Sequence, residues 1–145
     1  MSEMIPAGQG KLLVLTPVNP VAGADFQVTQ PIRTRWRVMS VKFVFTASAG
    51  VADRIMNLQF IAAGMIVVEM NARAVITASE VWTVTYMYSG VYVPTTGGRV
   101  VTGGMPENML VNDSMVITSR VGNIQAGDQI SDVAILVEEW MEPLA

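Results

Sequence analysis

The chain has 145 residues and a formal net charge of −3, with 51% apolar and only 14% charged residues. It contains neither cysteine nor histidine, which excludes disulfide bonds, thiolate metal sites and histidine-based acid–base catalysis. This length is typical of one domain, so we expect a single domain over residues 1–145 that folds without covalent crosslinks.

The low content of charged residues predicts that much of the surface meets other protein. An ordinary soluble domain carries about 25% charged residues, and here only Lys11 and Lys42 are lysines. Interfaces are depleted in lysine and enriched in arginine, methionine and aromatic residues, and the chain contains 11 methionines. We therefore expect a homo-oligomer, because a lone copy has few polar groups to cover itself.

Membranes and nucleic acids are not expected as partners. The longest apolar run covers residues 61–68, whereas a spanning helix needs roughly 20 residues. The first residues lack the basic region and apolar stretch of a secretory signal, which favours synthesis in the cytoplasm. The only cluster of cations is Arg33, Arg35 and Arg37, and phosphate backbones require more.

Runs of Val, Ile, Thr and aromatic residues, separated by Gly, Pro, Asn and Asp, predict strands throughout the chain. Residues 1–20, which contain several prolines, are expected to form an extended N-terminal segment. A short amphipathic helix is the alternative for residues 53–62, although strand is favoured there. In chain order, we expect strands near Lys11–Thr16, Asp25–Thr29, Thr34–Ala47, Ile55–Ala62, Met65–Met70, Ala74–Ala78, Val81–Val93, Ser114–Arg120 and Asp132–Trp140.

Two of these runs alternate clearly. Val84 and Tyr86 lie on one face of the run that starts at residue 81, and in the last run Val133, Ile135 and Val137 share a face. The opposite face of the last run is also largely apolar, so we expect a second sheet on one side and a neighbouring subunit on the other. Eight or nine short strands in one domain predict an all-β antiparallel sandwich, with a jelly roll as the expected topology.

One long loop is expected over residues 94–113, because the run contains Gly97-Gly98, Gly103-Gly104 and Pro106 without a strong strand pattern. Loops of nearly twenty residues are unusual inside a compact domain and are often functional.

The residue inventory gives little support for catalysis, a cofactor or a metal site. Without histidine, only a Ser–Lys pair with Lys11 or Lys42 could activate a serine, and the spacing of these residues does not indicate one. Glu138 and Glu139 are adjacent on a predicted strand and therefore point to opposite faces. Asp128 follows Ala126-Gly127 and is expected to cap backbone amides of its own turn. We expect a non-enzymatic protein.

The segment Arg33-Thr-Arg-Trp-Arg37 carries the only local charge pattern. Alternation predicts that the three arginines lie on one face of a strand, with Trp36 opposite. Like charges on one face require acceptors, which predicts either an interface or a solvated edge that discourages aggregation. The candidate interface residues are Arg33, Arg35, Trp36, Arg37, Trp140 and Met141.

Two stretches carry a family resemblance. The first runs from Trp36 to Phe45 and continues through a small-residue turn into residues 51–54. The second contains Met105-Pro106 and Leu110, then a strand through residues 117–119 and the run from residue 124 to 140. Over roughly residues 30–142 this pattern resembles small virion proteins from the structural modules of tailed bacteriophages.

The resemblance implies a jelly-roll subunit, commonly trimeric, that decorates or cements the capsid by binding the major capsid protein. Residues 1–20 and the predicted loop would be the parts that reach a neighbour. The alternative is a neck, tail or fibre component of the virion with a partner- or carbohydrate-binding surface. In that case Trp82, Tyr86, Tyr88 and Tyr92 could supply a platform on which sugars stack, although alternating aromatic residues are more often core.

Overall fold

The computed structural model describes residues 10–88, 99–106, 109–111 and 114–141. Within these ranges there is no helix, and hence none that could cross a membrane. The strands in chain order are β1 (Lys11–Leu15), β2 (Gln27–Thr29), β3 (Thr34–Thr46), β4 (Arg54–Ala62), β5 (Met65–Ile76), β6 (Val81–Tyr88), β7 (Val100–Met105), β8 (Met109–Val111), β9 (Val116–Gly122) and β10 (Gln129–Met141).

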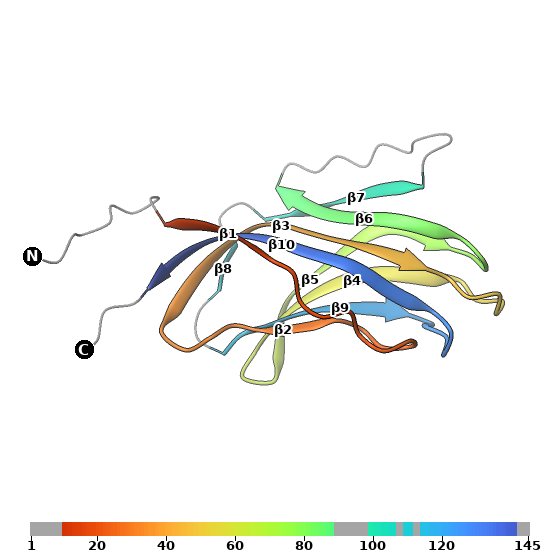
Figure 1. Cartoon of the computed structure of the whole chain (residues 1–145), viewed down its shortest axis with the longest axis horizontal. Helices are drawn as coiled ribbons and strands as arrows, with labels where there is room; N and C mark the ends of the chain where they lie inside the picture. Colours follow the sequence, from red (N-terminus) through yellow and green to blue (C-terminus); the bar gives the residue numbers. More distant parts are fainter. Residues whose placement is uncertain (1–9, 89–98, 107–108, 112–113, 142–145) are drawn as a thin grey trace, which may run out of the picture.

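The strands form two sheets that face each other (Figure 1). The larger sheet has the order β1-β10-β3-β6-β7, and β8 pairs with the first part of β3. The smaller sheet has the order β2-β9-β4-β5. The expectation of an all-β sandwich is therefore confirmed.

Pairing between the strands follows one nested pattern. β4 pairs with β5, β3 with β6, β2 with β9 and β1 with β10, all of them antiparallel. The innermost turn consists of Ala63 and Gly64, which both have positive φ. Two central residues with positive φ form the type I′ turn whose twist matches a hairpin.

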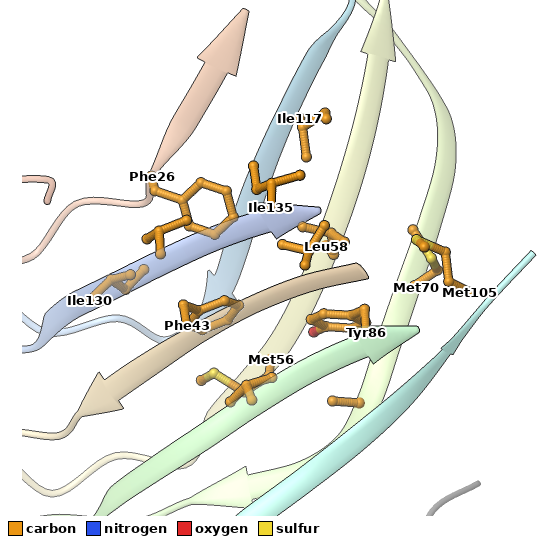
Figure 2. Close-up of a cluster of buried hydrophobic side chains, with 14 of the residues drawn as sticks. Phe26, Phe43, Met56, Leu58, Met70, Tyr86, Met105, Ile117, Ile130 and Ile135 are labelled. Carbon is orange, nitrogen blue, oxygen red and sulfur yellow. The ribbon is translucent and has the colours of Figure 1, made fainter. Parts of the chain in front are cut away.

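The core consists of side chains from both sheets that interdigitate between them (Figure 2). From the larger sheet, Phe43, Tyr86 and Ile135 point inward, and Leu58 meets them from the smaller sheet. Alternation of buried and exposed positions along β3 and β6 produces this inner face. Each strand of the larger sheet therefore presents its other residues to the outside.

The structure corrects three predictions. The two strands predicted over residues 65–78 are one continuous strand, β5. The predicted loop over residues 94–113 contains strands β7 and β8, while residues 94–98, 107–108 and 112–113 lie outside the described residues. In the predicted extended N-terminal segment, residues 11–15 form the edge strand β1 and pair with β10 of the same chain; residues 1–9 lie outside the described residues.

The glycine pair of β7 explains why the sequence pattern failed there. Gly103 is paired with Tyr86 of the parallel strand β6, and a Cβ at this glycine would lie 2.8 Å from the ring. Only a residue without a side chain fits so close to the aromatic ring. Glycine therefore marks close packing here, although in the sequence it reads as a turn signal.

Candidate functional site

The outer face of the larger sheet carries many exposed apolar side chains. Because Phe43 and Val84 point into the core, their neighbours Lys42, Val44, Thr83 and Thr85 point outward. We call this surface the apolar face. Its apolar members are Leu12, Val14, Met39, Val44, Val81, Met87, Val100, Leu110, Ala134 and Leu136.

Cross-strand register arranges these residues in rows across the sheet. One row is Val14, Leu136, Ser40 and Met87, contributed in turn by β1, β10, β3 and β6. A second row is Ala134, Lys42, Thr85 and Thr102. A third row is Ser131, Val44, Thr83 and Val100. Side chains that are neighbours in such a row lie about 4.5–5.5 Å apart, so Val14 and Leu136 lie next to each other. Serine, threonine and lysine side chains lie between most of the other apolar members.

Several of these side chains are strongly exposed. Leu12 and Val14 on the edge strand β1 are 64% and 62% exposed, and Leu110 on β8 is 50% exposed. The inner face of the same sheet is already filled by core side chains. The apolar face is therefore a second hydrophobic surface, beyond what the fold itself requires.

At one end of the apolar face, an ion pair is satisfied within the chain. Arg37 on β3 pairs with Glu138 on β10, and the guanidinium also lies 6.0 Å from the ring centroid of Trp140. The backbone N–H of Gly10 donates to the other carboxylate oxygen of Glu138 at 2.6 Å. Arg37 is therefore held by residues of its own chain, with exposed Leu12 and Leu110 on either side of the pair.

The expectation for the arginine segment holds only in part. Arg35 and Arg37 share the outer side of β3, but Arg33 lies in the preceding turn with φ of 62°. Trp36 points inward as predicted, and its indole N–H donates to Glu139 at 2.8 Å. Glu138 and Glu139 therefore do face opposite sides of β10.

Burial changes the set of candidate interface residues. Trp36 is 3% exposed and cannot touch a partner. Arg33, Arg35 and Met141 are exposed, and Trp140 is half-buried. The remaining candidates thus lie at one end of the larger sheet, beside the apolar face.

The four aromatic residues proposed as a sugar platform do not form one surface. Tyr86 is fully buried in the core (Figure 2), and Trp82 faces inward in the same alternation. Tyr88 is exposed, and Tyr92 lies outside the described residues.

A second apolar surface lies at the tip of the β4–β5 hairpin. Met65 is 70% exposed, and Ile66 and Val67 follow it with about half of their surfaces exposed. Beside the tip is an open hollow of about 450 Å³. Its lining combines apolar, hydroxyl and amide groups from Gln27, Ile61, Ala63, Gly64, Ser114, Val116 and Thr118.

The middle of the smaller sheet's outer face carries amide and carboxylate side chains. Asn71 donates a hydrogen bond to Asn57 at 2.7 Å, and Gln59 donates to Glu69. Arg120 is exposed in the neighbouring strand β9. The two sides of the sandwich thus differ in chemistry, and the larger sheet is the side suited to burial against protein.

A buried ion pair joins two loops at the opposite end of the larger sheet from Arg37. The fully buried Arg54 and Asp128 meet there, and Asp128 also accepts from the backbone N–H groups of Ser48 and Gln125. The sequence predicted that Asp128 caps backbone amides of its own turn, and the N–H of Gln125 is such an amide. No pattern in the sequence indicated Arg54, which lies 74 residues away from Asp128. Both oxygens of the carboxylate accept hydrogen bonds within the chain, so this ion pair has a structural role. We call the Arg54–Asp128 pair the clasp.

Comparison with known proteins finds no family model, no curated protein and no solved structure that matches this chain. Among the described residues there is also no group of three or more Asp and Glu side chains that could hold a metal ion. The functional proposal therefore depends on the surfaces described above.

Proposed function

We propose that this chain is a non-enzymatic structural subunit of a symmetric protein assembly, and that the assembly is the virion of a tailed bacteriophage. The observation that carries this proposal is the apolar face, which lies outside a sandwich whose interior is already packed. Even in soluble monomers the largest apolar patch, about 300–600 Å² in size, is often functional. Such a face indicates a surface that another protein covers.

The strand pairing supports a jelly roll as the topology within this proposal. Nested pairing of β1 with β10, β2 with β9, β3 with β6 and β4 with β5 is what results when one long hairpin rolls up. A roll of this kind places two Greek keys in two sheets, an architecture used by viral capsid proteins and by lectins. β7 and β8 would be additions between the sixth and seventh strands of the roll.

Within the virion, we assign the chain to capsid decoration or cementing, with the major capsid protein as partner. The chain offers two separate apolar surfaces, the apolar face and the β4–β5 tip. A subunit that contacts neighbours through two surfaces can bridge them, and bridging stabilises only the assembled lattice. The trimeric state implied by the family resemblance suits such a role.

Heat resistance of the particle tests this proposal. Particles that lack the protein should release their DNA at a lower temperature than complete particles, and added wild-type protein should restore the higher temperature. Ile66→Asp at the hairpin tip should fail to restore it. The matched control is Val75→Asp, on the same strand and equally exposed, which should restore it. Particles with identical heat resistance with and without the protein would rule out cementing.

A neck, tail or fibre component remains the second candidate, and the hollow beside the β4–β5 tip is the observation that favours it. Its volume is within the range of small-ligand sites, and hydroxyl and amide groups line it. Binding of a glycan by the isolated protein, abolished by Thr118→Val in the hollow, would support this role. An image of the intact particle that places the protein at the tail would do the same.

A further inference from the structure

The apolar face carries few charges that are not already paired within the chain. Lys42 projects from the middle of the face on β3, and the exposed Asp132 lies on the neighbouring strand β10. Asp132 lies in a bulge between Ser131 and Ala134, where φ is 52° and the side chain is exposed. Among the described residues, neither Lys42 nor Asp132 has an ion pair or a side-chain hydrogen bond.

These two charges make the face self-complementary. In a two-fold contact both copies use the same patch. If residue i of the first copy contacts residue j of the second, then residue j of the first copy also contacts residue i of the second. A surface that carries an unpaired cation on one strand and an unpaired anion on the neighbouring strand can therefore satisfy both with a second copy of itself. A partner of one charge sign would leave either Lys42 or Asp132 facing a like charge.

We infer that the apolar face is a two-fold interface between two copies of this chain, in which Lys42 of each copy pairs with Asp132 of the other. This inference rests on the proposed structural role, and it identifies a second copy of the chain as the partner that covers the apolar face.

The size of the face agrees with such an interface. A Val, Leu or Met side chain has on the order of 100 Å² of apolar surface. Seven members of the face are 38–64% exposed, so together they offer roughly 350 Å². Each partner in a standard interface buries about 800 Å², of which about 57% is apolar, or roughly 450 Å². The partly buried Val44 and Leu136 and the threonine methyl groups supply much of the remainder.

The contact also accommodates the trimer implied by the family resemblance. A two-fold contact between trimers would give six copies, and a two-fold contact alone would give two. In both cases the mass of the assembly should fall by half when the contact is broken.

Charge reversal followed by mixing tests the pairing. Lys42→Glu alone places Glu against Asp132 of the partner, and Asp132→Lys alone places Lys against Lys42. We expect each single variant to dissociate about tenfold or more readily than the wild type, because like charges are then juxtaposed. A 1:1 mixture of the two variants restores both opposite-charge contacts, so it should associate again to the wild-type mass. Light scattering after size exclusion measures the mass.

Arg120→Glu is the matched control, since this exposed charge lies on the smaller sheet, and its mass should equal that of the wild type. Wild-type protein that is a monomer, or a trimer whose mass neither reversal changes, would overturn the inference. Single variants that dissociate and stay apart on mixing would overturn it as well. In that case Lys42 and Asp132 would not contact each other across the interface, and each substitution would act within its own chain.

Asp132→Lys faces a specific folding risk, because Asp132 has a left-handed backbone conformation. If that variant does not fold, Lys42→Glu and Lys42→Met are compared instead. Lys42→Glu should dissociate more readily than Lys42→Met, and equal dissociation would overturn the pairing. The outcome is separate from that of the proposed function: a monomer that still raises particle heat resistance would overturn only the interface, and a dimer without effect on particles would overturn only the cementing.

Discussion

Arg54 and Asp128 form a bidentate ion pair at the centre of a loop cluster, and both side chains are fully buried. The guanidinium donates from Nε to Oδ2 at 3.0 Å and from Nη2 to Oδ1 at 2.9 Å. Arg54 also donates to the backbone carbonyl groups of Gly50 and Ala52. Asp128 ties this loop to the start of β10, so the pair closes one end of the sandwich.

Removal of the Arg54 side chain should therefore lower the free energy of unfolding. Arg54→Met leaves the Asp128 carboxylate buried without its cation, and loss of one partner of a buried pair costs about 3–5 kcal/mol. Urea unfolding measures this loss in the free energy of unfolding. Arg120→Met removes an exposed arginine instead and should change that free energy by less than about 0.5 kcal/mol. Equal effects of the two substitutions would contradict a structural role for the clasp.

The clasp also predicts how stability depends on pH. Burial of Asp128 raises its pKa, but hydrogen bonds from Arg54, Gln125 and Ser48 outweigh burial and lower the pKa from 3.8 to about 2. A lowered folded-state pKa stabilises the protein above the unfolded-state pKa, and this stabilisation is lost as the pH falls from about 4 toward 2. The loss should be roughly 2 kcal/mol. Asp128→Asn should flatten this part of a plot of unfolding free energy against pH; an unchanged slope would contradict the assignment.

Gly103 should not tolerate a side chain. A Cβ there would lie 2.8 Å from the ring of Tyr86 and 3.3 Å from the backbone of Ala72, and overpacking of this kind costs about 1–3 kcal/mol. We expect Gly103→Ala to lower the thermal midpoint of unfolding. The control is Gly122→Ala, whose Cβ would make ordinary contacts with Ile55 at 3.4 Å or more. Equal midpoints for the two variants would show that β7 does not pack this closely on β6.

Tyr86→Phe should be neutral or stabilising. Within the part of the chain that the structure describes, the buried Tyr86 hydroxyl has no hydrogen-bond partner, and burial raises the pKa of the hydroxyl. An unsatisfied buried polar group costs about 1–3 kcal/mol, so replacing it with hydrogen removes a penalty and no bond. Urea unfolding should give a free energy equal to or above that of the wild type. A loss of more than about 1 kcal/mol would reveal a partner for this hydroxyl.

The sequence by itself determined the all-β class, most of the strands and which residues share a face in the longest ones. Alternation with period two is a local property, and Val84 points inward because its neighbours Thr83 and Thr85 are suited to point outward. In the last strand both faces are apolar, so the pattern groups Val133, Ile135 and Val137 on one face, and the packing of the second sheet decides that this face is buried. The sparse charge also predicted that surface would be covered by protein, although it could not say which surface. Similarly, the local turn indicated the cap at Asp128.

Only the tertiary structure decided how distant segments combine. Arg54 and Asp128 lie 74 residues apart, and no local pattern links them, because their attraction depends on a shared buried site. The glycines of β7 became part of a strand since Tyr86 lies against one of them. The apolar face likewise exists because β1, β10, β3, β6 and β7 are brought side by side. Each strand alone contributes a few outward side chains, and pairing order turns them into one surface.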